Sequence, residues 1–112
     1  MPRRQWDIRI DDIIAATEKV LRYTEGMDKS AFVADERTVD AVVRNLIVIG
    51  EAARHVPDDV VAANPQIPWA RMRGMRNLVV HEYFGVDVDV LWDTVTGNLP
   101  ALLPLLQDLL DA

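Results

Sequence analysis

The chain has 112 residues, half of them hydrophobic, and a formal net charge of −6. This length suits a single domain over residues 1–112 with a modest core, and the absence of cysteine excludes a disulfide framework, a cysteine-ligated zinc site and a thiol nucleophile. The acidic balance argues against a general nucleic-acid-binding protein, and we expect no DNA partner.

The first predicted helix covers about residues 6–25. Apolar residues recur at helical spacing from Trp6 to Leu21, with charged residues between them. Gly26 is the expected stop, and residues 27–34 are interpreted as a connection. Because neither a signal peptide nor a membrane span is visible, we expect a cytoplasmic protein with no membrane partner.

The second predicted helix covers about residues 35–56. Its middle, residues 46–49, is apolar on nearly every side and rich in β-branched residues, so a buried strand is an alternative. The length of the segment and its polar positions favour a central helix. Gly50 costs this helix about 1 kcal/mol relative to alanine, and we expect close packing against a neighbouring helix as the compensation.

The second half of the chain continues the helical pattern. A short helix is predicted over 57–63, a rigid proline-containing connection over 64–68, and a further helix over 69–83 that stops at Gly85. Asp87 is the expected cap of the last helix, which two prolines, Pro100 and Pro104, must kink or segment. The predicted fold class is therefore all-α.

A short basic stretch precedes the acidic end of the chain. It contains Arg71, Arg73 and Arg76 and no acidic residue, and no lysine or arginine follows it. Such an asymmetry can place an anion at one site. On charge alone, however, a solvated helix face is the better interpretation.

The candidate site follows on the same predicted helix. Arg76 and Tyr83 are seven residues apart and share a face, as do Asn77 and His81, which are four apart. Arg76 and His81 are on different sides of an ideal helix, so a groove or a second copy of the chain is needed to bring them together.

An arginine and an imidazole can cleave RNA without a metal. Histidine can accept or donate a proton near neutral pH, and arginine can hold a phosphate and oppose the charge of the transition state. Asn77 can hydrogen-bond the phosphate or the imidazole. In a two-fold dimer, one His81 can serve as base and the other as acid.

A purely structural interpretation competes with this chemistry. His81 is favoured near a helix C-terminus, Arg76 can pair with Glu51 or Glu82, and Tyr83 can belong to the core. On spacing alone this interpretation is favoured, since an Arg–His pair is a weak motif. We also expect a structural role for His55, core positions for Trp69 and Trp92, and neither a metal site nor a cofactor.

The order Arg76-Asn-Leu-Val-Val-His81-Glu-Tyr83 resembles the motif of the HepT-like ribonucleases, toxins of the HEPN superfamily, which is arginine, four residues, histidine, one residue and tyrosine. Further similar stretches spread the resemblance over most of the chain; they are 49–53, 65–69, 84–87, 92–93 and 99–100.

This resemblance implies a four- to five-helix, up-and-down HEPN-type bundle that forms a homodimer. It implies a metal-independent RNA endonuclease with Arg76 and His81 as catalytic residues, acting as the toxin of a type VII toxin–antitoxin system. It also implies an MNT-type nucleotidyltransferase antitoxin that transfers AMP to Tyr83. Arg71 and Arg73 would bind the RNA backbone or the acquired phosphates.

Two alternatives remain open from the sequence. One is a non-catalytic helical module that partners a nucleotidyltransferase and presents Tyr83 or a nucleotide pocket, which the acidic balance favours. The other is a helical bundle without a site.

Overall fold

The computed structural model describes residues 4–81 and 87–112, with residues 77–81 described at the level of the backbone. All regular elements in these ranges are helical, as the sequence predicts. In chain order they are α1 (Asp7–Tyr23), α2 (Lys29–Ala34), α3 (Glu36–Arg54), α4 (Asp58–Ala63), α5 (Trp69–His81), α6 (Val88–Asp93), the π-helical segment η1 (Thr94–Asn98) and α7 (Leu99–Asp111).

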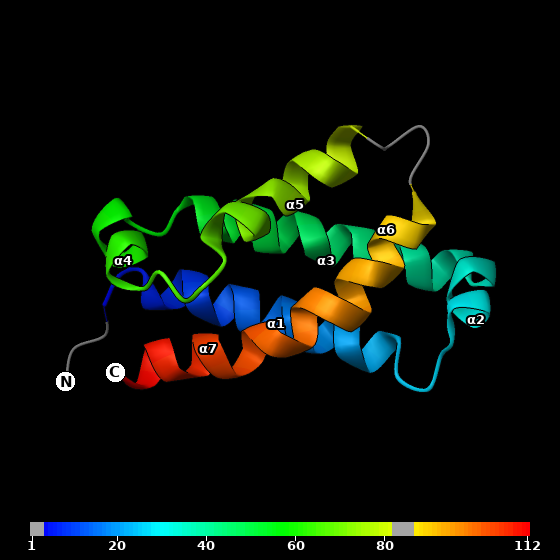
Figure 1. Cartoon of the computed structure of the whole chain (residues 1–112), viewed down its shortest axis with the longest axis horizontal. Coiled ribbons are helices and arrows are strands. Elements are labelled where there is room, and N and C mark those ends of the chain that lie inside the picture. The colour runs from blue at the N-terminus through cyan, green and yellow to red at the C-terminus, as the bar shows by residue number, and fades with distance from the viewer. Residues whose placement is uncertain (1–3, 82–86) are drawn as a thin grey trace.

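Helix α3 is the centre of the bundle. It packs against α1 on one side and α5 on the other, and α1 also packs against α7. Figure 1 shows α1, α3 and α7 running along the long axis of the molecule, while α5 diverges from α3 towards its C-terminal end. The all-α bundle expected from the sequence is therefore confirmed. None of the described helices is long and apolar enough to cross a membrane.

The apolar stretch in the middle of α3 is helical, which confirms the helix over the alternative of a buried strand. Val42, Leu46, Ile49 and Ala53 are fully buried and recur at the spacing of one helix face. The helix begins after Asp35, whose carboxylate accepts a hydrogen bond of 3.1 Å from the amide of Thr38.

The region between the first two predicted helices corrects two expectations. The first helix ends at Tyr23, earlier than the expected stop at Gly26, and Gly26 lies in the turn that follows with a φ of +77°, which glycine adopts at low cost. Residues 27–34, however, are more than a connection, because Lys29–Ala34 forms α2. Asp28 caps this helix by accepting from the Ala31 amide at 2.8 Å, and the fully buried Phe32 fixes it to the core.

The last predicted helix is divided into α6, η1 and α7, and the division precedes Pro100. Asp87 caps α6 as expected, accepting hydrogen bonds from the next amides. The wider turn of η1 follows, in which the Leu99 amide donates to the Thr94 carbonyl, and it ends at Asn98, two residues before Pro100. Pro104 lies inside α7, which continues to Asp111 despite the missing amide donor.

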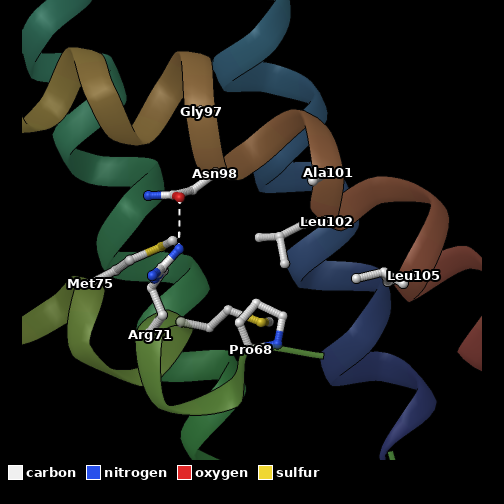
Figure 2. Close-up of a pocket in the computed structure, with 9 residues that line it drawn as sticks. Pro68, Arg71, Met75, Gly97, Asn98, Ala101, Leu102 and Leu105 are labelled. Atoms are coloured by element: carbon white, nitrogen blue, oxygen red, sulfur yellow. Dashed lines mark hydrogen bonds between the residues drawn. The ribbon is translucent and has the colours of Figure 1, made fainter. Parts of the chain in front are cut away.

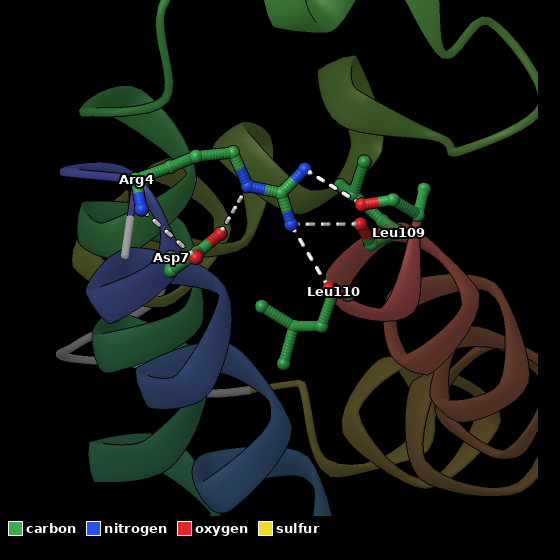
Figure 3. Close-up of polar contacts among 5 residues, drawn as sticks. Arg4, Asp7, Leu109 and Leu110 are labelled. Carbon is green, nitrogen blue, oxygen red and sulfur yellow. Dashed lines mark hydrogen bonds and ion pairs between the residues drawn. The ribbon is translucent and has the colours of Figure 1, made fainter. Parts of the chain in front are cut away.

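A single arginine joins the start of α1 to the end of α7. The Nε of Arg4 pairs with the Asp7 carboxylate at 2.9 Å, and its Nη2 donates to the Leu110 carbonyl at 2.9 Å and the Leu109 carbonyl at 3.4 Å (Figure 3). Its guanidinium also lies 4.2 Å from the centre of the Trp6 ring. Arg4 thereby supplies donors to carbonyls that the helix end leaves without intrahelical partners.

Candidate functional site

The candidate motif begins in the second half of α5. Arg76 lies within this helix, Asn77 follows it, and His81 is its last described residue. The side chains of Asn77 and His81 lie outside the described part of the structure, as do Tyr83 and the expected stop at Gly85. Arg76 is therefore the one motif residue whose side-chain contacts the structure describes.

The backbone of Arg76 rests directly on α3. A Cβ atom added at Gly50 would lie 2.7 Å from the backbone nitrogen of Arg76 and 2.8 Å from its Cβ. Only a residue without a side chain permits this approach of the two helices. The close packing expected at Gly50 is confirmed, and the residue that it admits is the candidate catalytic arginine.

The head of Arg76 is held by the residue after Gly50. The Nε of Arg76 lies 2.7 Å from Oε1 of Glu51, which is one of the two partners that the structural interpretation of the sequence offered for this arginine. The other partner, Glu82, lies outside the described residues. Both side chains are about two-fifths exposed. An exposed ion pair contributes little stability, at most about 1 kcal/mol, so its main effect is to orient the guanidinium.

Glu51 holds a second arginine as well. Nη1 of Arg54 lies 3.2 Å from the same Oε1 atom, and its side chain is half exposed. Arg54 was not identified as a site residue from the sequence. Its position three residues after Glu51, on the same face of α3, is the signal that could have revealed it.

Arg73 lies on the same side of α5 as Arg76 but bonds to main-chain oxygens. Its Nε donates to the carbonyl of Ala53 at 3.2 Å and its Nη2 to that of Val56 at 3.3 Å. These carbonyls belong to the C-terminal end of α3, where cations are favoured. Because the partners are uncharged, Arg73 keeps its full positive charge while stabilising the α3–α5 contact.

The predicted basic stretch is therefore divided between two faces of α5. Arg73, Arg76 and Arg54 line a shallow depression whose remaining lining is Ala70 and Gly74. Arg71 instead donates from Nη1 to Oδ1 of Asn98 at 2.9 Å, on the side of α5 that faces η1.

A second pocket lies between α5 and the η1–α7 segment, with a volume of about 160 Å³. Figure 2 shows the Arg71–Asn98 hydrogen bond across its rim. Met72, Met75 and Leu102 are buried residues of its lining, so the interior is largely apolar. Neither Asn98 nor this pocket was expected from the sequence, because the pocket depends on how α5 meets η1.

The two tryptophans and the histidine that were expected to have structural roles lie outside the depression and the second pocket. Trp69 is buried, as expected, and its indole N–H donates to the Asn64 carbonyl at 2.9 Å. Trp92 is half-buried with its ring 5.2 Å from that of Phe32. His55 is exposed at the end of α3. Among the described side chains, those of residues 4–76 and 87–112, no group of three or more histidine or acidic residues could hold a metal ion.

Comparison with known proteins gives consistent matches over nearly the whole chain. The family model described as "Ribonuclease HepT-like" matches residues 13–109. A probable ribonuclease HepT of Thermococcus cleftensis is 42% identical over 93 residues, covering 83% of this chain and 84% of the relative. A putative RNase of Methanocaldococcus jannaschii is 34% identical over 100 residues, covering 89% and 83% of the two chains. No solved structure matches.

Proposed function

The chain belongs to the HepT-like ribonuclease family and is a ribonuclease, and we propose that it is a metal-independent RNA endonuclease with Arg76 and His81 as its catalytic residues. The observation that carries this proposal is the double restraint on Arg76. Gly50 admits its backbone against α3 and Glu51 binds its Nε. An arginine held at its backbone by the helix contact and at its Nε by a carboxylate is suited to meet a phosphate with little reorganisation.

The proposed reaction uses the RNA's own nucleophile. The 2′-hydroxyl attacks the adjacent phosphorus atom and the bond from phosphorus to the 5′-oxygen breaks, which leaves a 2′,3′-cyclic phosphate and a 5′-hydroxyl. One His81 accepts the proton of the 2′-hydroxyl, and a second protonates the departing 5′-oxygen. Arg76 opposes the charge on the phosphoryl oxygens, and Asn77 hydrogen-bonds the phosphate or the imidazole.

A homodimer is part of the proposal because one copy of α5 does not bring the required groups together. Arg76 and His81 are five residues apart, which places them on different sides of the helix. A two-fold axis near the end of α5 would place both copies of His81 and both copies of Arg76 in one cleft at the interface. Arg71 and Arg73 would bind RNA phosphates on either side of this helix.

We further propose that the protein is the toxin of a type VII toxin–antitoxin pair, neutralised by an MNT-type nucleotidyltransferase. The tyrosine hydroxyl of Tyr83 attacks the α-phosphorus of ATP, pyrophosphate leaves, and AMP remains attached to the oxygen. The added phosphate brings negative charge and the purine brings bulk close to Arg76 in sequence. Both would exclude an RNA phosphate from the site.

The nuclease proposal is tested by RNA cleavage in the presence of EDTA. Wild-type protein should cut RNA to products with cyclic phosphate ends, and His81→Ala should abolish cutting while its circular dichroism spectrum is unchanged. Undiminished cutting by a folded His81→Ala variant would refute the catalytic assignment. Arg76→Lys should also be inactive, because an ammonium cannot reproduce the guanidinium's two-sided contacts.

The AMP transfer is tested by intact mass after co-expression with the transferase. A gain of one or more AMP units that Tyr83→Phe eliminates is the expected result. An unchanged mass in the presence of an active transferase would remove this form of regulation.

A second candidate function is a non-catalytic module that binds a nucleotidyltransferase. The observation in its favour is the net charge of −6, which opposes RNA binding. A tight complex without RNA cleavage at any protein concentration would support this candidate, and cleavage that depends on both Arg76 and His81 would reject it.

A further inference from the structure

The depression between α3 and α5 concentrates positive charge in an otherwise acidic protein. Three arginines line it, and the carboxylate of Glu51 pairs with two of them, Arg54 and Arg76. Its other lining residues in the described part of the chain, Ala70 and Gly74, are small. The chain as a whole carries −6, so this local excess of positive charge stands out from its surroundings.

The three arginines are arranged by different contacts. Arg54 and Arg76 approach the same oxygen of Glu51, so both guanidinium groups contact one atom. Arg73 is anchored through two uncharged carbonyls at the end of α3. Arg54 and Arg76 thus share the negative charge of Glu51, while the partners of Arg73 are uncharged. The three arginines and Glu51 together have a formal net charge of about +2.

Stability does not account for Arg54 in this cluster. Its pair with Glu51 is exposed and spans three residues of one helix, a type of contact that contributes about 0.2–0.5 kcal/mol. Half of its side chain remains accessible to solvent. Arginine forms charge-assisted hydrogen bonds with phosphate oxygens, so an accessible guanidinium beside a restrained one can contact a second phosphate of the same strand.

We infer that Arg54, Arg73 and Arg76 form a phosphate-binding subsite for single-stranded RNA, in which Arg54 binds a phosphate next to the one held by Arg76. This inference rests on the proposed function, and it adds a residue of α3 to a site otherwise built from α5. The subsite reads the backbone and carries no preference for a base sequence. It also explains how an acidic protein holds a polyanion, since the contact is local.

The inference is tested with an RNA that can bind but cannot be cut. A short, fluorescently labelled, fully 2′-O-methylated oligonucleotide lacks the attacking hydroxyl, so its anisotropy reports binding without chemistry. The affinity is measured over a series of KCl concentrations for wild type, Arg54→Ala, Arg54→Lys and Arg22→Ala. Arg22 lies in the last turn of α1, outside the depression, and its replacement removes the same charge.

Arg54→Ala is expected to lower the slope of log affinity against log salt by about 0.7, the value for one phosphate contact on a single strand. The same loss corresponds to about fivefold weaker binding near 0.1 M salt. Arg54→Lys should keep most of the slope, because it keeps the charge, and Arg22→Ala should keep all of it.

The inference is overturned if wild type does not bind the oligonucleotide, if Arg54→Ala keeps the wild-type slope, or if Arg22→Ala loses as much. These results are independent of the nuclease assignment, which is measured on unmodified RNA. Binding that depends on Arg54 while His81→Ala still cuts would retain the subsite and reject the catalytic residues. Cutting that depends on His81 with an unchanged Arg54→Ala slope would do the reverse.

Discussion

Replacing Gly50 by alanine should destabilise the protein, although alanine is the better helix former. Inside a helix the substitution alone would add about 1 kcal/mol to the free energy of unfolding. Here the new methyl group would lie 2.7 Å from the backbone nitrogen of Arg76. Because that atom belongs to a rigid helix, α5 must move, and overpacking of this kind costs about 1–3 kcal/mol. Because the new methyl group would contact a backbone atom, we expect the upper part of that range. After the gain in helix preference is subtracted, the net loss in the free energy of unfolding should be about 2 kcal/mol.

Gly74 provides a matched control on the facing helix. A Cβ added at Gly74 has no neighbouring atom within 4 Å, so Gly74→Ala should gain about 0.5–1 kcal/mol from the helix preference. Urea unfolding followed by circular dichroism measures both variants. The same chemical change should therefore shift the midpoint in opposite directions at an unchanged slope.

Gly50→Ala should also reduce RNA cleavage at temperatures where the variant is fully folded. The displaced helix carries Arg76, and a misplacement of about 1 Å can reduce the rate of a positioned reaction by about 100-fold. A variant at least as stable as wild type, with full activity, would refute the argument that this contact positions Arg76.

Three further predictions follow from the polar contacts. Glu51→Gln should change the free energy of unfolding by less than about 1 kcal/mol. It should lower kcat for RNA because it releases Arg76, and it should lower KM because it removes a negative charge. An unchanged kcat would contradict the orienting role of Glu51. Arg73→Met should lower the free energy of unfolding by about 1–3 kcal/mol, through the loss of two hydrogen bonds to α3 carbonyls, and a urea midpoint equal to wild type would count against this. Hydrogen bonds from Thr38 hold the pKa of the Asp35 carboxyl below its ordinary value, so its contribution is present above the unfolded-state pKa of about 3.9 and is lost as the pH falls through the lower folded-state pKa. Wild type should therefore lose stability relative to Asp35→Asn in that acid range, and parallel pH profiles would refute the assignment.

The sequence predicts part of the site where a residue is unfavourable in its own helix and so indicates a tertiary contact. A glycine in the middle of a long helix predicts a close neighbour, and the structure supplies one at Gly50. The pairing of Arg76 with Glu51 follows from the chemistry of the two residues and their places on adjacent helices. The first prediction depends on residue type and the second on opposite charges on neighbouring helices, and neither requires the packing angle between the helices.

The separation of the basic stretch onto two faces of α5 was not predicted from the sequence. Three arginines that are close in sequence suggest one strip, but two residues along a helix correspond to about 200° of rotation. Arg71 and Arg73 consequently face different neighbours, Asn98 and the end of α3. Arg54 joins Arg76 only because α3 and α5 pack closely at Gly50. Such a cluster depends on tertiary packing, which periodicity does not specify.

The contacts of Arg4 have a consequence for local opening of the molecule. This residue bonds a helix end that lies 105 residues further along the chain, so fraying at the start of α1 and at the end of α7 requires breaking the same hydrogen bonds. The two segments should open as one cooperative unit. In hydrogen–deuterium exchange, amides near Asp7 and near Leu110 should therefore exchange at similar rates, and Arg4→Ala should accelerate both together.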